Sequence, residues 1–279
     1  MKGVAYAAGT VLNALATGIG SAFGIDLRTV VEIKPDEGSE VRVVINGVER
    51  RSMVAERILR AEKISGEVTV ESEIPGGSGL GSSSAFVNAL LVAVKKLKGE
   101  VLDAHEILKT NARISLEAGI SYTGAFDDAS ASLIGGFVVS DNTKMRLYRW
   151  DRISSHAAVL IPHFKRGKVN WREIRSNSAR ILPAVKDAMN GDYCSAMRKN
   201  TEYYCEMIGY PLEIARAGWE IGVCCGLSGN GSSFVAFGSK SEMKSVANVW
   251  KNYGEVRIRS VVEKPVEKFI VPESIFIKT

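Results

Sequence analysis

Residues 73–86 read EIPGGSGLGSSSAF, and this stretch decides how the rest of the chain is interpreted. It holds four glycines and four serines, and apolar sequence follows directly. The alternating pattern GEVTVESEI (66–74) predicts a strand before it, with the valines on one face. The run SSSAFVNALLVAVKKLK (82–98) predicts an apolar helix after it, closed by lysines before Gly99. The sequence therefore predicts a glycine-rich loop between a strand and a helix.

Such a loop brings several backbone N–H groups and the positive end of a helix to one place, which is how proteins bind phosphate. Glycines have no side chain, so a phosphate group can approach the backbone closely. The serines add hydroxyl donors or an oxygen ligand for Mg²⁺. The alternative is a flexible turn capped by Ser82, but the register of strand, loop and helix favours a phosphate site.

Two common phosphate-binding patterns are absent. A Walker A loop requires Gly-Lys-Ser or Gly-Lys-Thr, and neither occurs in the chain. The dinucleotide pattern GxGxxG fails after Gly77 and Gly79 because its last position is Ser82. It also fails after Gly18, where the last glycine comes one residue late at Gly24.

The loop resembles the P-x-x-x-G-L-G-S-S motif of the GHMP kinases, the family of galactokinase and of homoserine, mevalonate and phosphomevalonate kinases; the matching residues are Pro75, Gly79, Leu80, Gly81, Ser82 and Ser83. GAFDDASASLIGG (124–136) is similar to the central segment of the family, and GLSGNGSSFVAF (226–237) to its C-terminal glycine-rich turn. Within the family, NALATGIGSAFGIDL (13–27), SGLGSSSA (78–85) and TGAFDDA (123–129) resemble the archaeal type of shikimate kinase. The resemblance covers the whole chain.

The patterns elsewhere predict an α+β fold of two lobes that meet near residue 150. Strands are expected at 41–47, 135–141, 156–162, 255–262 and on both sides of the turn within 222–238; helices at 103–119, 192–208, 211–221, 241–254 with Ser241 as N-cap, and within 169–191 with a break at Pro183. The resemblance implies a two-lobed GHMP kinase fold. In it, an N-terminal lobe (1–150) like the second domain of ribosomal protein S5 would bind ATP, and a C-terminal lobe (151–279) would be a ferredoxin-like α/β plait, with ATP and acceptor in the cleft.

The resemblance also implies which residues bind ATP and Mg²⁺. The phosphates would lie against the loop formed by Pro75, Gly76, Gly77, Ser78, Gly79, Leu80, Gly81, Ser82, Ser83, Ser84 and Ala85. The metal ion would be held by Ser83 and by Glu117, the only carboxylate in RISLEAGISYTG (113–124).

Asp127 and Asp128 form an adjacent pair of carboxylates, which repel each other and therefore need a cap, a cation or a catalytic role. Counting seven residues back from Gly135, as in the mevalonate kinase pattern, selects Asp128 as the base or as the group that orients the attacking hydroxyl. Asp127 would be a second substrate or metal contact. The alternative is that both residues cap a short helix.

Candidate acceptor-binding residues come from three stretches of the chain: Asn13, Ser21 and Asp26 are polar in an apolar N-terminal run, Ser228, Gly229 and Asn230 form the C-terminal turn, and Arg175 or Arg180 could pair with an acceptor carboxylate. The sequence does not choose between the two arginines.

The implied activity is the ATP-dependent phosphorylation of the 3-hydroxyl of shikimate to give shikimate 3-phosphate and ADP, a step of chorismate and aromatic amino-acid biosynthesis. Three alternatives remain. The acceptor could be homoserine or a mevalonate-type alcohol, or the chain could be a non-catalytic nucleotide sensor. It could also bind RNA, because this type of lobe occurs in ribosomal proteins and the segment 144–180 is basic; its basic residues are Lys144, Arg146, Arg149, Arg152, Lys165, Arg166, Lys168, Arg172, Arg175 and Arg180.

Composition predicts a globular protein without a membrane span. Hydrophobic residues make up 46% and charged residues 24%, and the net charge is +5. No apolar run approaches the roughly 20 residues of a spanning helix, and residues 1–20 lack a clear signal-peptide core and cleavage site. The four cysteines, Cys194, Cys205, Cys224 and Cys225, fit no disulfide scaffold, so buried free thiols are expected. We expect a cytoplasmic monomer or homodimer with no nucleic-acid or membrane partner, and the resemblance implies ATP and shikimate as its small-molecule substrates.

Overall fold

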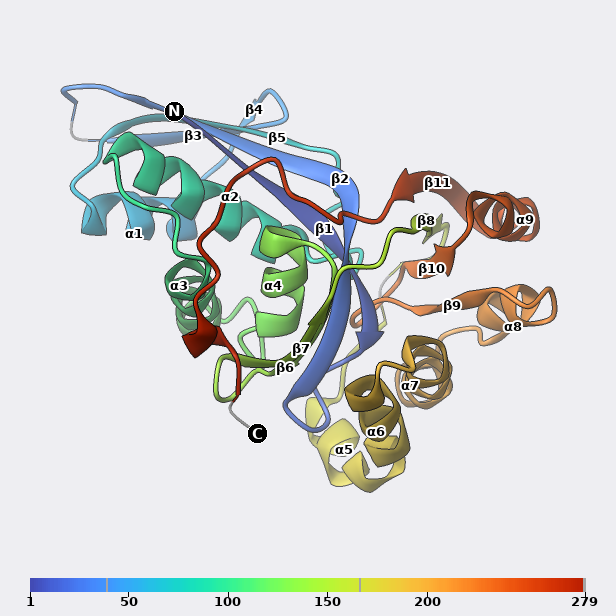
Figure 1. The fold of residues 1–279 in the computed structure, drawn as a ribbon. Coiled ribbons are helices and arrows are strands. Elements are labelled where there is room, and N and C mark those ends of the chain that lie inside the picture. Colours follow the sequence, from blue (N-terminus) through green and yellow to red (C-terminus); the bar gives the residue numbers. More distant parts are fainter. Residues whose placement is uncertain (39, 166, 278–279) are drawn as a thin grey trace.

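A computed structural model describes residues 1–38, 40–165 and 167–277, and within them the chain forms two β-sheets (Figure 1). The larger sheet has the strand order β4-β3-β5-β2-β6-β7, and β1 pairs along the long strand β2. The start of β2 also pairs with β6 and its end with β5, so β2 joins both halves of the sheet. The bounds are β1 Lys2–Leu12, β2 Ile19–Pro35, β3 Val41–Ile45, β4 Val48–Glu49, β5 Gly66–Ser72, β6 Phe137–Asp141 and β7 Arg146–Asp151.

The smaller sheet is antiparallel and has the order β11-β8-β10-β9. Its strands are β8 His156–Pro162, β9 Cys224–Leu227, β10 Phe234–Gly238 and β11 Gly254–Ser260. The strand predicted from HAAVLIP is confirmed as β8, and the strands predicted on both sides of the glycine-rich turn are β9 and β10.

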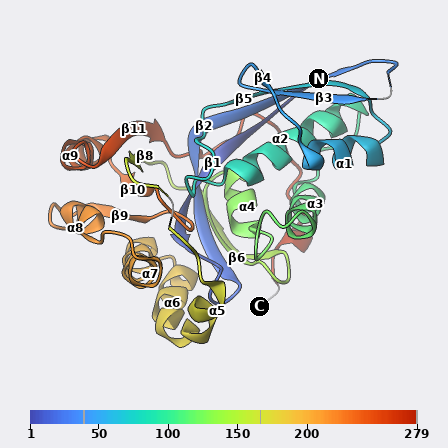
Figure 2. The same ribbon diagram turned by 180° about the vertical axis from the view of Figure 1, so that it is seen from behind.

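Helices α2 and α4 pack against the larger sheet, and α3 packs against both helices (Figure 2). The apolar run at 82–98 forms α2 as predicted. Asp103 caps α3 by accepting a hydrogen bond from the amide of Glu106, as its position suggested. The bounds are α1 Met53–Ala61, α2 Ser82–Leu97, α3 Ala104–Glu117 and α4 Phe126–Ile134.

Of the helices after β8, α7, α8 and α9 pack against the smaller sheet, whereas α6 packs against α7 and contacts β1 and β2 of the larger sheet. Two details of this region differ from the sequence prediction. The helix predicted within 169–191 breaks before Pro183, which lies in the first turn of α6. Ser239, not Ser241, is the N-cap of α9, because its hydroxyl accepts from the amide of Glu242 while the Glu242 carboxylate accepts from the amide of Ser239. The bounds are α5 Trp171–Ser176, η1 Ser178–Ile181, α6 Leu182–Asn190, α7 Tyr193–Ile208, α8 Glu213–Trp219 and α9 Lys240–Trp250.

Aromatic side chains join the two sheets. The rings of Phe23 in β2 and Phe137 in β6 lie 5.0 Å apart, and Phe237 in β10 lies 5.4 Å from the first and 4.9 Å from the second. Tyr193 at the start of α7 packs on Phe137 at 4.9 Å. Burial of such large rings stabilises strongly, so this cluster is a firm contact between the sheets.

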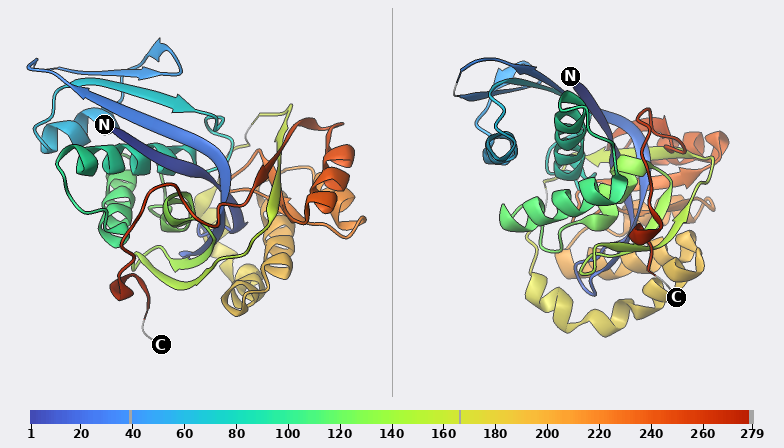
Figure 3. Two further views of the ribbon diagram at one scale, coloured as in Figure 1. Left: turned by 45° about the horizontal axis from the view of Figure 1, so that its top comes forward. Right: turned by 60° about the vertical axis from the view of Figure 1, so that its left-hand side comes forward.

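The segment 261–277, called the strap below, leaves the smaller sheet and returns across the larger one (Figure 3). It makes isolated bridges from Val261 to Ile25, from Ile270 to Asp103 and from Phe276 to Leu147. A short 3₁₀ helix, η2 Glu273–Ile275, lies near its end. The division into lobes of residues 1–150 and 151–279 stays a prediction.

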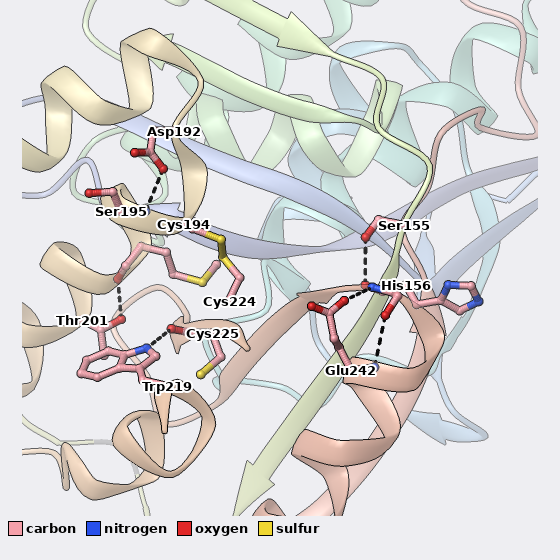
Figure 4. The surroundings of a disulfide bond; sticks show 12 residues. Ser155, His156, Asp192, Cys194, Ser195, Thr201, Trp219, Cys224, Cys225 and Glu242 are labelled. Atoms are coloured by element: carbon pink, nitrogen blue, oxygen red, sulfur yellow. Dashed lines mark hydrogen bonds between the residues drawn. A yellow bond between two sulfur atoms is a disulfide. The ribbon is translucent and has the colours of Figure 1, made fainter. Parts of the chain in front are cut away.

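The expectation that all four thiols are free is wrong for two of them. Cys194 at the start of α7 forms a disulfide with Cys224 at the start of β9 (Figure 4). The cysteines lie 30 residues apart, and only the packing of α7 against β9 brings their Cα atoms to 5.3 Å, a normal separation for a disulfide. Cys205 and Cys225 are buried and free as predicted, and burial raises the pKa of both thiols to about 12.

We expect Cys194→Ser to lower the free energy of unfolding by about 3–4 kcal/mol, because the disulfide closes a loop in the unfolded chain. Urea unfolding of both proteins with and without reductant measures this effect. Reductant should destabilise the native chain and leave the variant unchanged. Equal sensitivity of the two proteins would contradict the prediction.

Within the described part of the chain, three of the ten basic side chains of 144–180 form ion pairs. Lys144, Arg149 and Arg180 pair with the carboxylates of Asp141, Asp151 and Glu206, respectively. Arg166 lies outside the described residues. Within the ranges that the structure describes, no helix is both long and apolar enough to cross a membrane.

Candidate functional site

A cleft opens where the glycine-rich loop, the segment before α4 and the turn between β9 and β10 meet. The loop contributes six of the predicted ATP-binding residues, while the segment before α4 contributes several hydroxyl groups. Both aspartates of α4 reach it. The lining residues are Thr10, Asn13, Ala14, Leu15, Gly77, Gly79, Gly81, Ser82, Ser83, Ser84, Ser115, Ile120, Ser121, Tyr122, Thr123, Ala125, Asp127, Asp128, Gly229 and Asn230.

The N-terminus of α2 faces this cleft. Gly81 is its N-cap residue, with φ of +67°, and provides no side-chain cap. The first amides of a helix have no partner within the helix, and the helix dipole adds positive charge there. Ser82, Ser83 and Ser84 carry these amides and line the cleft. The geometry of an anion site predicted from the sequence is therefore present.

The other residues of the loop form its frame. Ser78 donates a hydrogen bond through its hydroxyl to the carbonyl of Pro75, at 2.7 Å. Leu80 is fully buried, and its carbonyl accepts a hydrogen bond from the amide of Ala8 at 3.1 Å. Pro75, Gly76, Ser78, Leu80 and Ala85 are not among the lining residues.

The turn between β9 and β10 holds the loop in place. The Ser228 hydroxyl donates to the carbonyl of Gly79 at 2.8 Å and accepts from the amide of Thr10 at 3.1 Å. The Gly229 amide donates to the Thr10 hydroxyl at 2.8 Å. A Cβ on Gly79 would lie 2.2 Å from the carbonyl oxygen of Ser228. Gly79 is therefore required by this close approach of two backbones.

Asp127 is buried and firmly held. Its Oδ1 accepts a hydrogen bond from Nδ2 of Asn142 at 2.8 Å, and its amide donates to Oδ1 of Asn142 at 3.2 Å. Its Oδ2 lies over Gly20, where an added Cβ would be only 2.1 Å away. Burial raises the pKa of Asp127, and the hydrogen bond from Asn142 opposes that rise.

Asp128 has an unsatisfied carboxylate oxygen at the cleft. Its Oδ1 is buried, and no hydrogen-bond donor reaches it from the part of the chain that the structure describes. Burial, together with the neighbouring Asp127, raises the pKa of Asp128 well above its usual range. Ala125 is the N-cap residue of α4, so neither aspartate occupies the capping position. An unpaired buried acceptor is costly, which points to a ligand that supplies the missing donor.

The N-terminal segment and the C-terminal turn meet at Asn13 and Asn230. Nδ2 of Asn13 donates to Oδ1 of Asn230 at 2.9 Å. Helix α7 supports this segment, because Oδ1 of Asn200 accepts from the amide of Asn13 at 2.9 Å. The Tyr204 hydroxyl donates to the carbonyl of Asn13 and accepts from the amide of Ala16. Two of the predicted acceptor-binding residues are thus brought together.

Outside the glycine-rich loop, the predicted site residues that do not line the cleft are Ser21, Asp26, Glu117, Arg175, Arg180 and Ser228. Ser21 is fully buried within β2, and Asp26 is partly exposed on the same strand and pairs with Arg28. Glu117 is exposed at the end of α3 and forms an ion pair with Arg57 of α1. In this position Glu117 does not line the cleft.

The two candidate arginines differ in their surroundings. Both nitrogens at the tip of Arg180 hydrogen-bond to the carboxylate of Glu206, on the exposed face of α7. Arg175 instead donates through Nε to the carbonyl of Leu15, a residue that lines the cleft, and it stacks on Trp171. Among the described residues no carboxylate pairs with Arg175. Neither arginine is among the lining residues, but Arg175 contacts one of them.

Several residues of the site were not predicted from the sequence. Thr10, Tyr122 and Thr123 line the cleft. Asn142 and Tyr204 hydrogen-bond to the lining residues Asp127 and Asn13, respectively. Thr123 lies within the stretch TGAFDDA that suggested the family, so proximity to the aspartates was a usable signal. No local pattern marks Asn142 or Tyr204, because their partners are distant in the sequence.

The described residues contain no cluster of three or more histidine, cysteine, aspartate or glutamate side chains that could hold a metal ion. Of the predicted pair of ligands, Ser83 lies in the cleft and Glu117 does not. Mg²⁺ bound with a nucleotide takes ligands from phosphates and water and needs only one or two from the protein. The predicted pair therefore fits only in part.

Known proteins resemble the chain in both sequence and structure. A model of the GHMP kinases N terminal domain matches residues 46–136. A protein named shikimate kinase from Archaeoglobus fulgidus is 63% identical over 278 residues, which cover 100% of this chain and 99% of that protein. Another of the same name from Methanosarcina acetivorans is 35% identical over 90% of this chain and 89% of its own.

Solved structures of similar fold include a mevalonate kinase and a homoserine kinase from Cytophaga hutchinsonii. The first has a TM-score of 0.73 at 16% identity and covers 94% of this chain and 98% of its own. The second has a TM-score of 0.70 at 17% identity and covers 94% and 96%. Such low identities show the two-lobed fold alone. The chain belongs to the GHMP kinase family, as the family model and the sequence identity to the archaeal relatives show.

Proposed function

We propose that the protein phosphorylates the 3-hydroxyl of shikimate with ATP, giving shikimate 3-phosphate and ADP. The observation that carries this proposal is the free, buried Oδ1 of Asp128 in the same cleft as the uncapped N-terminus of α2. The Asp128 oxygen suits a hydroxyl that must lose its proton, and the N-terminus of α2 suits the phosphates of ATP. The relatives named shikimate kinase support the choice of acceptor.

In this mechanism the chain aligns two substrates and removes one proton. The amides of the glycine-rich loop and of α2 hold the phosphates of ATP. The 3-hydroxyl oxygen attacks the γ-phosphorus, the bond from that phosphorus to the β–γ bridging oxygen breaks, and the hydroxyl proton passes to Asp128. The raised pKa of Asp128 makes its ionised carboxylate a better base than an ordinary carboxylate.

Mg²⁺ would enter with ATP as part of the substrate. The Ser83 hydroxyl in the first turn of α2 lines the cleft and would contact the ion, whereas Glu117 would have to leave Arg57 first. The ion would neutralise charge on the phosphates. In the same proposal the lobe of residues 1–150 binds ATP, the lobe of residues 151–279 closes the cleft, and the enzyme acts in the cytoplasm.

Arg175 is the proposed partner of the shikimate carboxylate. We expect Arg175→Ala to raise KM for shikimate by about 10- to 100-fold, the usual worth of a hydrogen bond between charged groups, with little change in KM for ATP. Arg180→Ala is the matched control and should be nearly silent, because Arg180 is already paired with Glu206 on the surface. Steady-state kinetics with each substrate varied in turn measure both. A larger rise in KM for shikimate in Arg180→Ala than in Arg175→Ala would reject Arg175 as the partner of the carboxylate.

The function itself is tested by ADP release with shikimate, homoserine or mevalonate as the only acceptor. We expect release with shikimate alone, and the product should be identified as the 3-phosphate. Release with homoserine or mevalonate instead would keep the kinase and replace the acceptor. No release with any of them, together with RNA binding that weakens steeply with salt, would replace the proposal by the RNA-binding alternative.

A further inference from the structure

Asn142 lies directly after β6 and is 1% exposed. Its Nδ2 donates to Oδ1 of Asp127 at 2.8 Å and to the hydroxyl of Thr123 at 3.2 Å. Its Oδ1 accepts from the amide of Asp127 at 3.2 Å and from the hydroxyl of Ser140 at 2.7 Å. Both donors and both acceptor positions of the amide are therefore used. A fully satisfied buried amide fixes the groups around it more rigidly than one with a missing partner.

We propose that Asn142 is a positioning residue for phosphoryl transfer, which fixes Asp127 and the first turn of α4 and thereby aims the Asp128 carboxylate at the acceptor hydroxyl. The inference rests on the proposed function of Asp128. Asn142 holds Asp127 at two points, its amide and its carboxylate. Because Asp127 and Asp128 are consecutive in one helical turn, a fixed backbone at the first sets the direction of the second.

The bare backbone of β2 supports the same arrangement from the other side. A Cβ on Gly20 would lie 2.1 Å from Oδ2 of Asp127, so the carboxylate occupies the space that this glycine leaves free. Asp127 is thus held between Asn142 and Gly20. The partner is a neutral amide, and among the described residues no lysine or arginine forms an ion pair with Asp127. The amide orients the carboxylate without neutralising it.

Asn142 also ties α4 to the segment that lines the cleft. Thr123 accepts from Asn142, and its hydroxyl accepts from the amide of Ala125, the N-cap residue of α4. Ala125 has φ of +47°, an uncommon conformation for a residue with a side chain, which the surrounding contacts must maintain. One side chain therefore controls both the entry to the helix and its first acidic residue.

The test compares Asn142→Asp, Asp127→Asn and the double variant. Asn142→Asp removes the donor to both Asp127 and Thr123, sets a second carboxylate against that of Asp127 and keeps the acceptors. We therefore expect kcat to fall by about 100-fold, the effect of a misplaced catalytic group, with KM for ATP little changed. The double variant exchanges donor and acceptor and rebuilds the hydrogen bond. It should be at least about 10-fold more active than the product of the two single losses predicts.

A purely structural role gives a different pattern, in which thermal stability falls and kcat stays native. Val159→Ala serves as the control for lost stability, because Val159 is buried in β8 away from the cleft. Native kcat in Asn142→Asp, or losses that simply multiply in the double variant, would overturn the inference while native activity with shikimate upholds the function. A native chain that releases no ADP with shikimate would overturn both.

Discussion

Asp128→Asn should lower kcat by about 10²- to 10⁴-fold, the usual worth of a positioned general base. Asparagine keeps the size of the side chain but cannot take the hydroxyl proton. ATP binding should be nearly unchanged, because the phosphate site lies on the glycine-rich loop and α2. Single-turnover rates and nucleotide affinity, measured on the same preparation, separate the two effects.

The same variant should be more stable than the native chain at neutral pH. The pKa of Asp128 is raised in the folded protein, so the folded state binds a proton more tightly than the unfolded one, and stability falls as pH rises above the unfolded pKa of about 3.8. Asparagine cannot ionise and avoids this cost. The difference in Tm should be largest at pH 8 and shrink as pH falls towards 4.

Asp127→Asn is the internal control for both measurements. Its loss in kcat should be smaller, because the new amide can still hydrogen-bond to Asn142. Near-native turnover of Asp128→Asn would refute the assignment of the base. A large loss at Asp127 alone would move that role one residue earlier.

Gly77→Val should weaken ATP binding by about 100-fold or more, the loss expected when two charge-assisted hydrogen bonds are blocked. Gly77 lines the cleft, and a Cβ added there meets no other atom within 4 Å. A side chain would therefore fill the space that a phosphate needs without disturbing the packed protein. Titration with ATP and a thermal melt of the same variant test both parts of this expectation.

Gly99→Val is the matched control for backbone strain. Gly99 has φ of +69°, close to the +71° of Gly77, and it too has open space around a Cβ, but it follows the far end of α2. Both valine variants should lose a similar amount of stability, and only Gly77→Val should lose affinity for ATP. Gly79→Val should lose both, because its Cβ would collide with the carbonyl of Ser228. Native ATP affinity in a folded Gly77→Val protein would reject the phosphate site.

Local signals were enough to predict the parts of the fold that local chemistry determines. Helix α2 follows from an apolar run between a glycine loop and a group of lysines, and β8 follows from one short apolar stretch. The N-cap of α9 was misplaced by two residues because Ser239 and Ser241 are both good caps, and only the reciprocal bond with Glu242 distinguishes them.

The sequence did not predict contacts between segments that lie far apart along the chain. The disulfide of Cys194 and Cys224 depends on how α7 packs against β9, which no spacing encodes. The motif predicted that Asp127 and Asp128 reach the cleft, but not that Asn142 holds one of them and leaves the other unpaired. Asp26 was proposed as a site residue for its polarity, yet it pairs with Arg28, which lies two residues further along the same strand.

The strap has a consequence for how the protein is made. During synthesis the ribosome releases residues 1–151, which contain every strand of the larger sheet, before it has made the strap. The bridges to Ile25, Asp103 and Leu147 form only after the whole smaller sheet has been translated. At typical translation speeds of about 5–20 residues per second, the earlier part of the chain waits several seconds or more for them. The part of the protein that is made first is thus completed by residues that emerge after all the others described here.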